Sequence, residues 1–232
     1  MLELRNIDLY YGASQVLFDV SLTAEVGKIT CLMGTNGAGK TSLLKVIGGV
    51  HPRSAGSFTF DCHEQPSAPR ADQLARAGVG YVPQGRDIFP MLTVQENLET
   101  GFACLPRDEC AVSDEIFELF PVLKEMRARR GGDLSGGQQQ QLAIGRALVS
   151  HPKVLLLDEP TEGIQPNIIK QIGEVVSYLK DQGDLSIILV EQYFDFAYEL
   201  GDTFTALRNG RVVLSGDHAD VTRDELVSAV SV

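Results

Sequence analysis

The segment from 34 to 42, Gly-Thr-Asn-Gly-Ala-Gly-Lys-Thr-Ser, constrains the fold of this chain more than any other stretch. It fits the pattern Gly-x-x-x-x-Gly-Lys-[Ser/Thr], in which glycines let consecutive backbone N–H groups turn inward around a phosphate. The apolar run 29–33 before it predicts a buried strand, and an apolar stripe after it predicts a helix, with Leu43, Leu44, Val46 and Ile47. The phosphate would lie at a helix N-terminus, where the dipole favours anions. We therefore predict a P-loop in an α/β nucleotide-binding fold.

The side chains of this loop have separate expected roles around ATP. Lys40 would add a point charge beside the phosphates, and the Thr41 hydroxyl would bind Mg²⁺. Tyr11 is an aromatic residue placed ahead of the loop, so it is a candidate to stack on adenine, with ordinary side-chain packing as the alternative. The loop residues expected around ATP are Gly34, Thr35, Asn36, Gly37, Ala38, Gly39, Lys40, Thr41 and Ser42.

The composition excludes several classes of protein. The chain has 232 residues and a net charge of −11, which argues against a nucleic-acid partner because phosphate neutralisation needs a basic face. Only the run 124–130 is basic, and we expect it to be a solvated helix face. The sequence has no apolar run of about 18 residues, so no membrane span is expected. A role in a membrane process would therefore need a partner that crosses the bilayer.

Two carboxylates follow a second apolar strand. The run 153–158 ends in Asp158, and Glu159 comes next. In a parallel sheet the carboxyl ends of strands meet at one edge, which places this pair beside the phosphate loop. Acidic residues are common in loops, but together with a P-loop this pair predicts nucleotide hydrolysis. Asp158 would hold Mg²⁺ through water, and Glu159 would polarise the attacking water.

The stretch Leu134-Ser-Gly-Gly-Gln138 predicts a second helix N-terminus suited to phosphate. Ser135 and Gln138 have the spacing of a capping box. Gly136 and Gly137 each weaken the first turn by about 1 kcal/mol relative to alanine, so a simple capped helix does not explain them. We expect close approach of a phosphate to this backbone. Since the chain already has one phosphate loop, two copies or two paralogues would share ATP across an interface.

The remaining pattern predicts the other elements. Loose alternation over 2–24 predicts antiparallel strands, and the runs 57–60, 79–82 and 185–190 predict further strands, with a polar loop at 61–69. A helix should begin at Pro166, and Asn209-Gly210 predicts a type I′ hairpin. Val94, Leu98 and Phe102 share one helical face in a mostly helical segment.

These motifs, in this order and with Gln84 between the first two, resemble the ATP-binding subunits of ABC transporters over essentially the whole chain. The resemblance implies an α/β fold of the ABC cassette type. It has a mixed, mainly parallel core sheet, an N-terminal antiparallel β-subdomain and an inserted α-helical lobe. The whole chain, 1–232, would be one ATPase domain. Residues 1–84 and 151–232 would form the RecA-like core with the β-subdomain, and 85–150 the helical lobe.

The resemblance also assigns roles. Tyr11 would stack on adenine and Glu159 would be the catalytic base. Gln84 would join Thr41 and Asp158 around Mg²⁺ and link that site to the permease contact. The ATP bound to a partner subunit would be contacted by Leu134, Ser135, Gly136, Gly137 and Gln138. Two positions depart from the family pattern: Gln192 stands at the switch position, usually histidine and counted among the catalytic residues, and Gln165 replaces an aspartate. Both departures imply two chemically unequal sites in the assembly.

Branch-specific stretches narrow the resemblance. Residues 81–90 and 190–192 are similar to the branched-chain amino acid type of importer ATPase, and 158–166 to its urea branch. This implies a second, different ATPase subunit, with a homodimer possible for the isolated chain, two permeases and a solute-binding protein. It also implies a peripheral location on the cytoplasmic face of the bacterial inner membrane. The segment 88–98 is the candidate permease contact, with lobe core as the alternative.

Other functions are kept as alternatives. The solute could be urea, a branched-chain amino acid or another amide, because nothing in this chain is expected to touch it. A soluble ABC ATPase of translation or DNA maintenance would usually have tandem cassettes or a long coiled-coil insertion. A P-loop kinase or GTPase would have no use for the 134–138 stretch.

Overall fold

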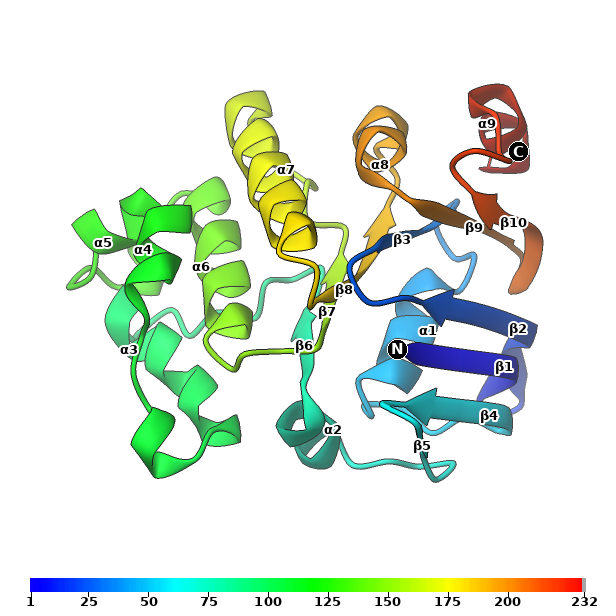
Figure 1. Ribbon diagram of the computed structural model, residues 1–232, viewed down its shortest axis with the longest axis horizontal. Coiled ribbons are helices and arrows are strands. Elements are labelled where there is room, and N and C mark those ends of the chain that lie inside the picture. The colour runs from blue at the N-terminus through cyan, green and yellow to red at the C-terminus, as the bar shows by residue number, and fades with distance from the viewer. Residues whose placement is uncertain (231–232) are drawn as a thin grey trace.

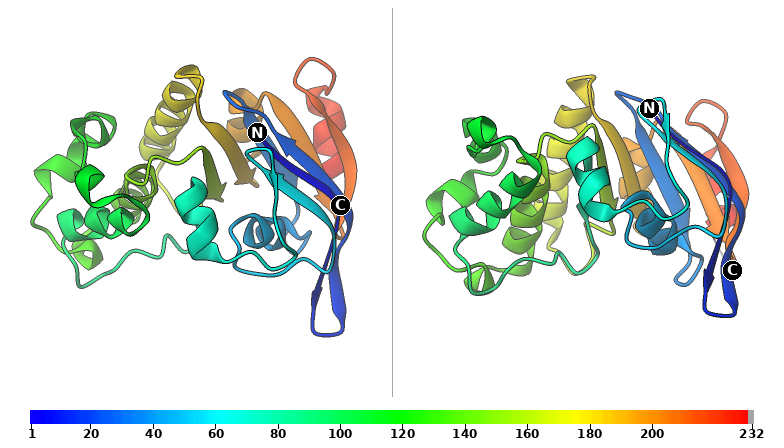
Figure 2. Two further views of the ribbon diagram at one scale, coloured as in Figure 1. Left: turned by 60° about the horizontal axis from the view of Figure 1, so that its bottom comes forward. Right: turned by 90° about the horizontal axis from the view of Figure 1, so that it is seen from below.

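The computed structural model describes residues 1–230, which form two sheets and a helical lobe (Figure 1). The first sheet has the strand order β2-β1-β4-β5 and is antiparallel. Its strands are β1 (Leu2–Tyr11), β2 (Ser14–Ala24), β4 (Ala55–Phe60) and β5 (His63–Glu64). The lobe stands at the opposite end of the molecule from this sheet (Figures 1 and 2). The predicted N-terminal antiparallel sheet and the predicted helical lobe are both present.

The second sheet has the order β10-β9-β3-β8-β7-β6 and forms the centre of the molecule. It contains β3 (Ile29–Gly34), β6 (Val79–Val82), β7 (Val154–Asp158), β8 (Ser186–Glu191), β9 (Thr203–Arg208) and β10 (Arg211–Asp217). All its pairs are parallel except β9–β10. The carboxyl ends of β3, β6, β7 and β8 therefore meet at one edge, which gathers the loops after each of them.

The central strands are apolar throughout because both of their faces are buried. On β3, Cys31 and Met33 belong to one hydrophobic core, whereas Leu32 belongs to the other. The second of these cores lies between the two sheets and includes the apolar stripe of α1 (Lys40–Ile47). The first core is covered by α7 (Pro166–Asp181), α8 (Phe194–Leu200), α9 (Arg223–Val230) and the lobe. The P-loop helix is thus held on one sheet face and the lobe on the other.

The lobe is built from short helices. They are α3 (Val94–Glu99), η1 (Thr100–Cys104), η2 (Arg107–Glu109), α4 (Asp114–Leu119), α5 (Pro121–Glu125), η3 (Gly131–Asp133) and α6 (Gly136–Leu148). Residues 85–93 contain no helix, so the lobe helices begin at Val94. Buried residues Leu98, Ile116, Leu123 and Leu142 come from four of these helices and share one core. This core joins the lobe to the central sheet.

Four local predictions need comment. The hairpin at Asn209-Gly210 is confirmed, with φ of 50° and 74°, as a type I′ turn requires. The prediction that Phe102 shares one helical face with Val94 and Leu98 is wrong, because α3 ends at Glu99 and Phe102 lies in η1. The predicted polar loop 61–69 contains the short strand β5. It is followed by α2 (Ala71–Ala77), which was not predicted from the sequence, because a helix with one buried residue has only a weak periodic pattern of apolar residues. The basic run is exposed, but only its first two residues are helical.

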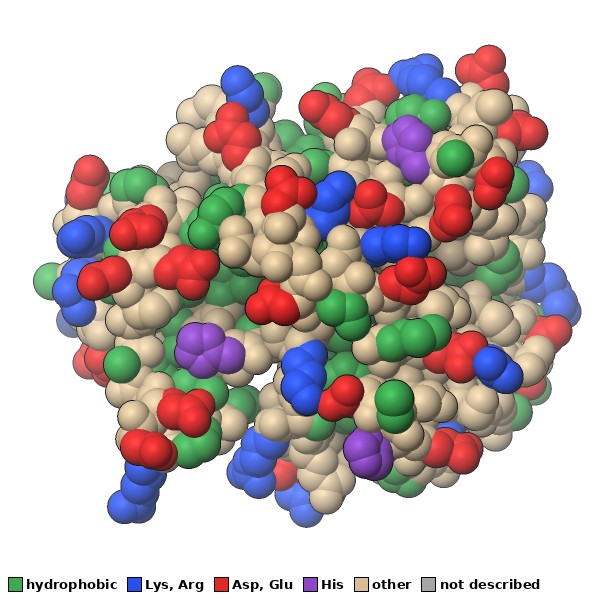
Figure 3. Space-filling view, in the orientation of Figure 1, with side chains coloured by type: hydrophobic (Ala, Val, Ile, Leu, Met, Phe, Trp, Pro, Cys, Tyr) green, Lys and Arg blue, Asp and Glu red, His purple; other side chains and the backbone are tan. Residues whose placement is uncertain are grey.

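On the face drawn in Figure 3, lysines and arginines are scattered among acidic side chains and form no continuous basic surface. Within residues 1–230, no helix is both long enough and apolar enough to cross a membrane.

Candidate functional site

The P-loop has the open backbone that phosphate binding needs. Gly34 has φ of 152°, and a Cβ there would lie 2.4 Å from the Leu207 carbonyl oxygen, so only glycine fits between the loop and β9. Gly39 precedes α1 in a left-handed conformation, and no side chain caps this helix. The first N–H groups of α1 are therefore left for an anion, as expected for a phosphate loop.

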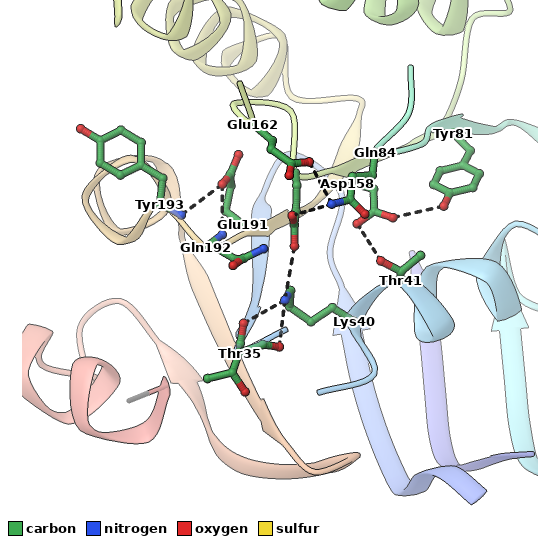
Figure 4. Close-up of polar contacts among 12 residues, drawn as sticks. Thr35, Lys40, Thr41, Tyr81, Gln84, Asp158, Glu162, Glu191, Gln192 and Tyr193 are labelled. Atoms are coloured by element: carbon green, nitrogen blue, oxygen red, sulfur yellow. Dashed lines mark hydrogen bonds and ion pairs between the residues drawn. The ribbon is translucent and has the colours of Figure 1, made fainter. Parts of the chain in front are cut away.

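Lys40 is held inside the loop by its own chain. Its side chain is 4% exposed, and Nζ donates to the carbonyl oxygens of Gly34 at 2.8 Å and Thr35 at 3.2 Å. Nζ also lies 3.4 Å from Oε1 of Glu159, which forms a buried ion pair (Figure 4). The predicted phosphate-binding lysine and the predicted catalytic base thus neutralise one another in this structure.

Glu159 has a constrained backbone and two side-chain partners. Its φ is 49°, an uncommon value for a residue with a Cβ, and its N–H donates to the Val190 carbonyl at 2.9 Å. The Oε2 atom accepts a hydrogen bond of 3.0 Å from Nε2 of Gln84. Gln84 Nε2 also donates to Oε2 of Glu162 at 2.9 Å. Gln84 therefore donates to two carboxylates through its amide nitrogen.

Asp158 and Thr41 face each other at the base of the site. Thr41 Oγ1 lies 3.2 Å from Asp158 Oδ1, and the Tyr81 hydroxyl lies 3.3 Å from Oδ2 (Figure 4). Burial raises the pKa of Asp158, and the charge of Glu159 adds to this effect, while the hydrogen bonds from Thr41 and Tyr81 oppose it. A divalent cation would relieve this buried negative charge. The hydroxyl and carboxylate oxygens are ligands that suit Mg²⁺.

Tyr11 lies beside the start of α1, where a nucleotide base would leave the P-loop. The residue is 39% exposed, so it is not part of the hydrophobic core. The hydroxyl lies 3.5 Å from Ser42 Oγ, and the ring meets His51 edge-on at 4.5 Å between centroids. An exposed aromatic face at this point suits stacking on adenine.

The 134–138 stretch begins α6 as predicted. Ser135 Oγ accepts from the Gln138 N–H at 3.4 Å, and Gln138 Oε1 accepts from the Ser135 N–H at 2.9 Å, which completes the capping box. The glycines have a cause that the sequence did not reveal. A Cβ on Gly136 would lie 3.1 Å from the Arg86 guanidinium, and one on Gly137 would lie 3.1 Å from Ile168. Packing within the chain therefore favours small residues here.

A cavity of about 930 Å³ opens beside this helix start. Its walls come from the lobe, from the segment after β7 and from α7, and they include Ser135, Gly136, Gly137 and Gln165. Figure 1 shows α6 in the lobe and α1 beyond β6 and β7, in a different part of the molecule. The helix that Ser135 caps therefore stands apart from the P-loop helix of the same chain.

Gln192 follows β8 at the same sheet edge as Asp158. Its side chain is exposed, and its backbone N–H donates to Oε2 of Glu191 at 3.1 Å. A cavity of about 320 Å³ lies between this loop and the P-loop, and its walls include Asn36, Glu159 and Gln192. The predicted switch residue thus shares a cavity with the predicted base.

Sequence reasoning missed several members of this network. The Tyr81 hydroxyl donates to Asp158, and Glu162 accepts a hydrogen bond from the Gln84 amide. Glu191 is buried beside Gln192. Glu191 ends an apolar strand as Asp158 does, so the same signal at the end of β8 could have identified it. Arg86 links Gln140 Oε1 at 3.2 Å with the Glu162 carbonyl at 3.2 Å, a connection that no spacing rule predicts.

Comparisons with known proteins agree with this geometry. The family model described as "ABC transporter" matches residues 17–162. A branched-chain amino acid transport ATP-binding protein, BraG of Pseudomonas aeruginosa, is 43% identical over 92% of this chain and 91% of its own length. A probable branched-chain amino acid transport protein, LivF of Archaeoglobus fulgidus, is 35% identical over 97% of this chain and 95% of its own length.

Solved structures show the same architecture. The ATP-binding subunit of an ABC transporter superposes with a TM-score of 0.86 at 26% identity, covering 99% of both chains. A dimeric ATP-binding cassette in a post-hydrolysis state, bound to ADP and phosphate, has a TM-score of 0.82 at 25% identity and covers 94% of this chain and 99% of its own. With the P-loop, the strand-end carboxylates and the capped α6 in place, this chain belongs to the ABC transporter family as an ATP-binding, ATP-hydrolysing subunit.

Proposed function

We propose that this chain powers an importer of the branched-chain amino acid type by binding and hydrolysing ATP on a permease. The observation that carries this proposal is the 43% identity to BraG over nearly the whole chain. The similarity to LivF points to the same class of solute. Since the chain has no helix able to span a membrane within residues 1–230, the permease would supply the path for the solute. The chain would then lie on the cytoplasmic face of the bacterial inner membrane.

ATP would be shared between two subunits. The P-loop and Tyr11 hold the nucleotide on one subunit, and Ser135, Gly136 and Gly137 of the other complete the site at the terminal phosphate. The separation of Ser135 from the P-loop within one chain supports this arrangement, and so does the dimeric relative bound to ADP and phosphate. In an importer of this type the second subunit would be a different ATPase, while the isolated chain could pair with itself.

The residues of this chain divide the hydrolytic work. Glu159 polarises the attacking water, because it is the carboxylate that meets Lys40 and Gln84. Thr41, Asp158 and Gln84 would hold Mg²⁺, which supplies charge stabilisation to the phosphates when it is bound. Gln192 occupies the switch position on the other side of the shared cavity.

The segment 88–98 offers a permease contact on the lobe. Phe89 is 49% exposed and Met91 71% exposed, whereas Val94 and Leu98 are fully buried in the lobe core. The exposure of Phe89 and Met91 speaks against a place for them in the lobe core and supports the permease-contact interpretation of this apolar cluster. The exposed apolar part, 89–91, follows Gln84 closely in sequence and would carry movement between the ATP site and the permease.

Uptake measurements separate the candidate solutes. In a strain lacking this gene, labelled leucine uptake should be lost, restored by the wild-type chain and not by K40A. Urea is the second candidate, favoured by the similarity of 158–166 to the urea branch, and labelled urea is measured in the same cells. Loss of urea uptake with normal leucine uptake would reject the first proposal and support the second.

Purification from membranes tests transport against a non-transport role. A tagged chain should copurify with integral permease subunits, and a double variant, F89S/M91S, should lose them while keeping ATP affinity. A tagged chain recovered without any membrane protein would favour a soluble ABC ATPase instead.

A further inference from the structure

Glu191 is a buried carboxylate that has no assigned role in ATP binding or hydrolysis. It is the last residue of β8 and is 2% exposed. Among the ion pairs formed within residues 1–230, none includes this carboxylate. A buried anion without a cation is costly unless hydrogen bonds compensate for the lost water. Its presence at the edge of the ATP site therefore calls for an explanation.

Three backbone N–H groups compensate Glu191, and they come from two loops. Figure 4 draws the two bonds from the loop of Gln192 and Tyr193. Oε1 accepts from the N–H of Thr161 at 3.0 Å. Oε2 accepts from the N–H of Gln192 at 3.1 Å and from that of Tyr193 at 3.2 Å. Each oxygen thus serves a different loop, and one rigid side chain fixes the distance between them.

Both loops carry residues of the hydrolytic site. Thr161 lies between Glu159 and Glu162, the two carboxylates that receive the Gln84 amide. Gln192 is the switch residue on the other loop. All of these except Gln84 line the cavity of about 320 Å³, together with Asn36 of the P-loop. A shift of either loop would change the distance between Glu159 and Gln192 across this cavity.

A carboxylate suits this task better than the neutral alternatives. Its two equivalent acceptor oxygens receive N–H groups from opposite sides, and hydrogen bonds to an ionised acceptor are the stronger kind. A glutamine of the same shape has one acceptor oxygen and would turn an NH₂ group toward one of the loops. An aspartate keeps the charge but is one methylene shorter.

We propose that Glu191 is a positioning residue for ATP hydrolysis, which holds the loop of Glu159 and the loop of Gln192 in register around the terminal phosphate. It acts through these two loops and does not touch the nucleotide. This inference depends on the ATPase activity and not on the identity of the transported solute.

The test compares E191Q with E191D and with E199Q, an exposed glutamate on α8 that serves as the matched control. Turnover is measured on the complex purified with its permease, with E159Q as the baseline for hydrolysis by the paired subunit. Because misplacing a catalytic group by about 1 Å can cost roughly 10²-fold, we expect E191Q to lower kcat by about 10- to 100-fold. E191D should recover part of that loss, E199Q should be unchanged, and the Kd for ATP of each isolated chain should stay within about threefold of wild type.

Hydrogen exchange reports directly on the three hydrogen bonds that Glu191 accepts from the two loops. In E191Q the amides of Thr161, Gln192 and Tyr193 should exchange faster, while the amides of the buried strand β3 keep their protection. A wild-type kcat in E191Q would overturn the proposal. Equal loss of ATP affinity, thermal stability and kcat in both E191Q and E191D would also overturn it, because that result describes a purely structural residue.

Discussion

The two helix ends proposed to contact phosphate are built in different ways. At the P-loop, Lys40 and Glu159 form a buried ion pair, and Gln84 links Glu159 to Glu162, so the charged groups satisfy one another. At α6, Ser135 and Gln138 satisfy the cap with neutral groups, beside a cavity of about 930 Å³. Charged side chains therefore hold the first helix end, whereas neutral hydrogen bonds and an open cavity characterise the second. ATP would have to replace internal contacts at the P-loop, whereas the capping hydrogen bonds of Ser135 and Gln138 could persist beside a bound nucleotide.

The largest expected effect follows from removing the charge of Glu159. E159Q should lower turnover by about 10²- to 10⁴-fold, because the attacking water loses its general base. ATP binding should persist, since the variant also removes the partner that holds Lys40 away from phosphate. Phosphate release from the purified complex and calorimetry on the isolated chain measure the two quantities. Unchanged hydrolysis would remove Glu159 from its role, and E199Q controls for a glutamate lost elsewhere.

Loss of the P-loop cation should affect affinity instead. K40A removes a charge-assisted contact worth roughly 1.5–3 kcal/mol, which corresponds to an ATP affinity about 10- to 150-fold weaker. Calorimetry on the isolated chain measures this, with K170A on the exposed face of α7 as the control. Wild-type affinity in K40A would refute the assignment of the P-loop.

A smaller effect should arise at the other helix end, and it sharpens the comparison. S135A removes the helix cap, which is worth about 1 kcal/mol and lowers the Tm by roughly 2–4 °C in a chain of this size. The ATP affinity of the isolated chain should not change if, as proposed, Ser135 contacts the nucleotide of another subunit. Calorimetry and thermal unfolding together test this. Weaker ATP binding by the isolated S135A chain would contradict a site shared between subunits.

The same comparison explains what the sequence could predict. The P-loop, Asp158, Glu159 and Ser135 lie at fixed offsets from strand or helix ends, so local patterns locate them. The partners of these residues depend on the order of strands in the sheet. Tyr81 reaches Asp158 because β6 lies beside β7, and Arg86 reaches Glu162 across the same edge.

Other failures came from tertiary packing. The glycines of the α6 start have neighbours, Arg86 and Ile168, that lie far from them in sequence, so their crowding could not be predicted. Phe102 has helical spacing from Val94 and Leu98, but the chain leaves the α-helix after Glu99 and continues as η1. In both cases the local pattern was compatible with the structure but did not determine it.

The smallest expected effect concerns the switch position. Gln192 does not titrate, so the wild-type chain should show no activity step near pH 6.5 from this residue. Q192H places an imidazole on an exposed position, where its pKa should stay near about 6.5. The ratio of Q192H to wild-type turnover should therefore change between about pH 6 and 7.

Taking this ratio removes the contribution of Asp158. Burial raises the pKa of Asp158, so its carboxylate takes up a proton at a higher pH than usual, and metal binding should weaken as the pH falls. This loss occurs in both proteins and cancels in the ratio. A step near pH 6.5 in the wild-type chain that disappears in Q192A would contradict the assignment. A flat ratio for Q192H would show that position 192 does not reach the reacting phosphate, which would leave the P-loop half of the site with Glu159 as its only hydrolytic side chain.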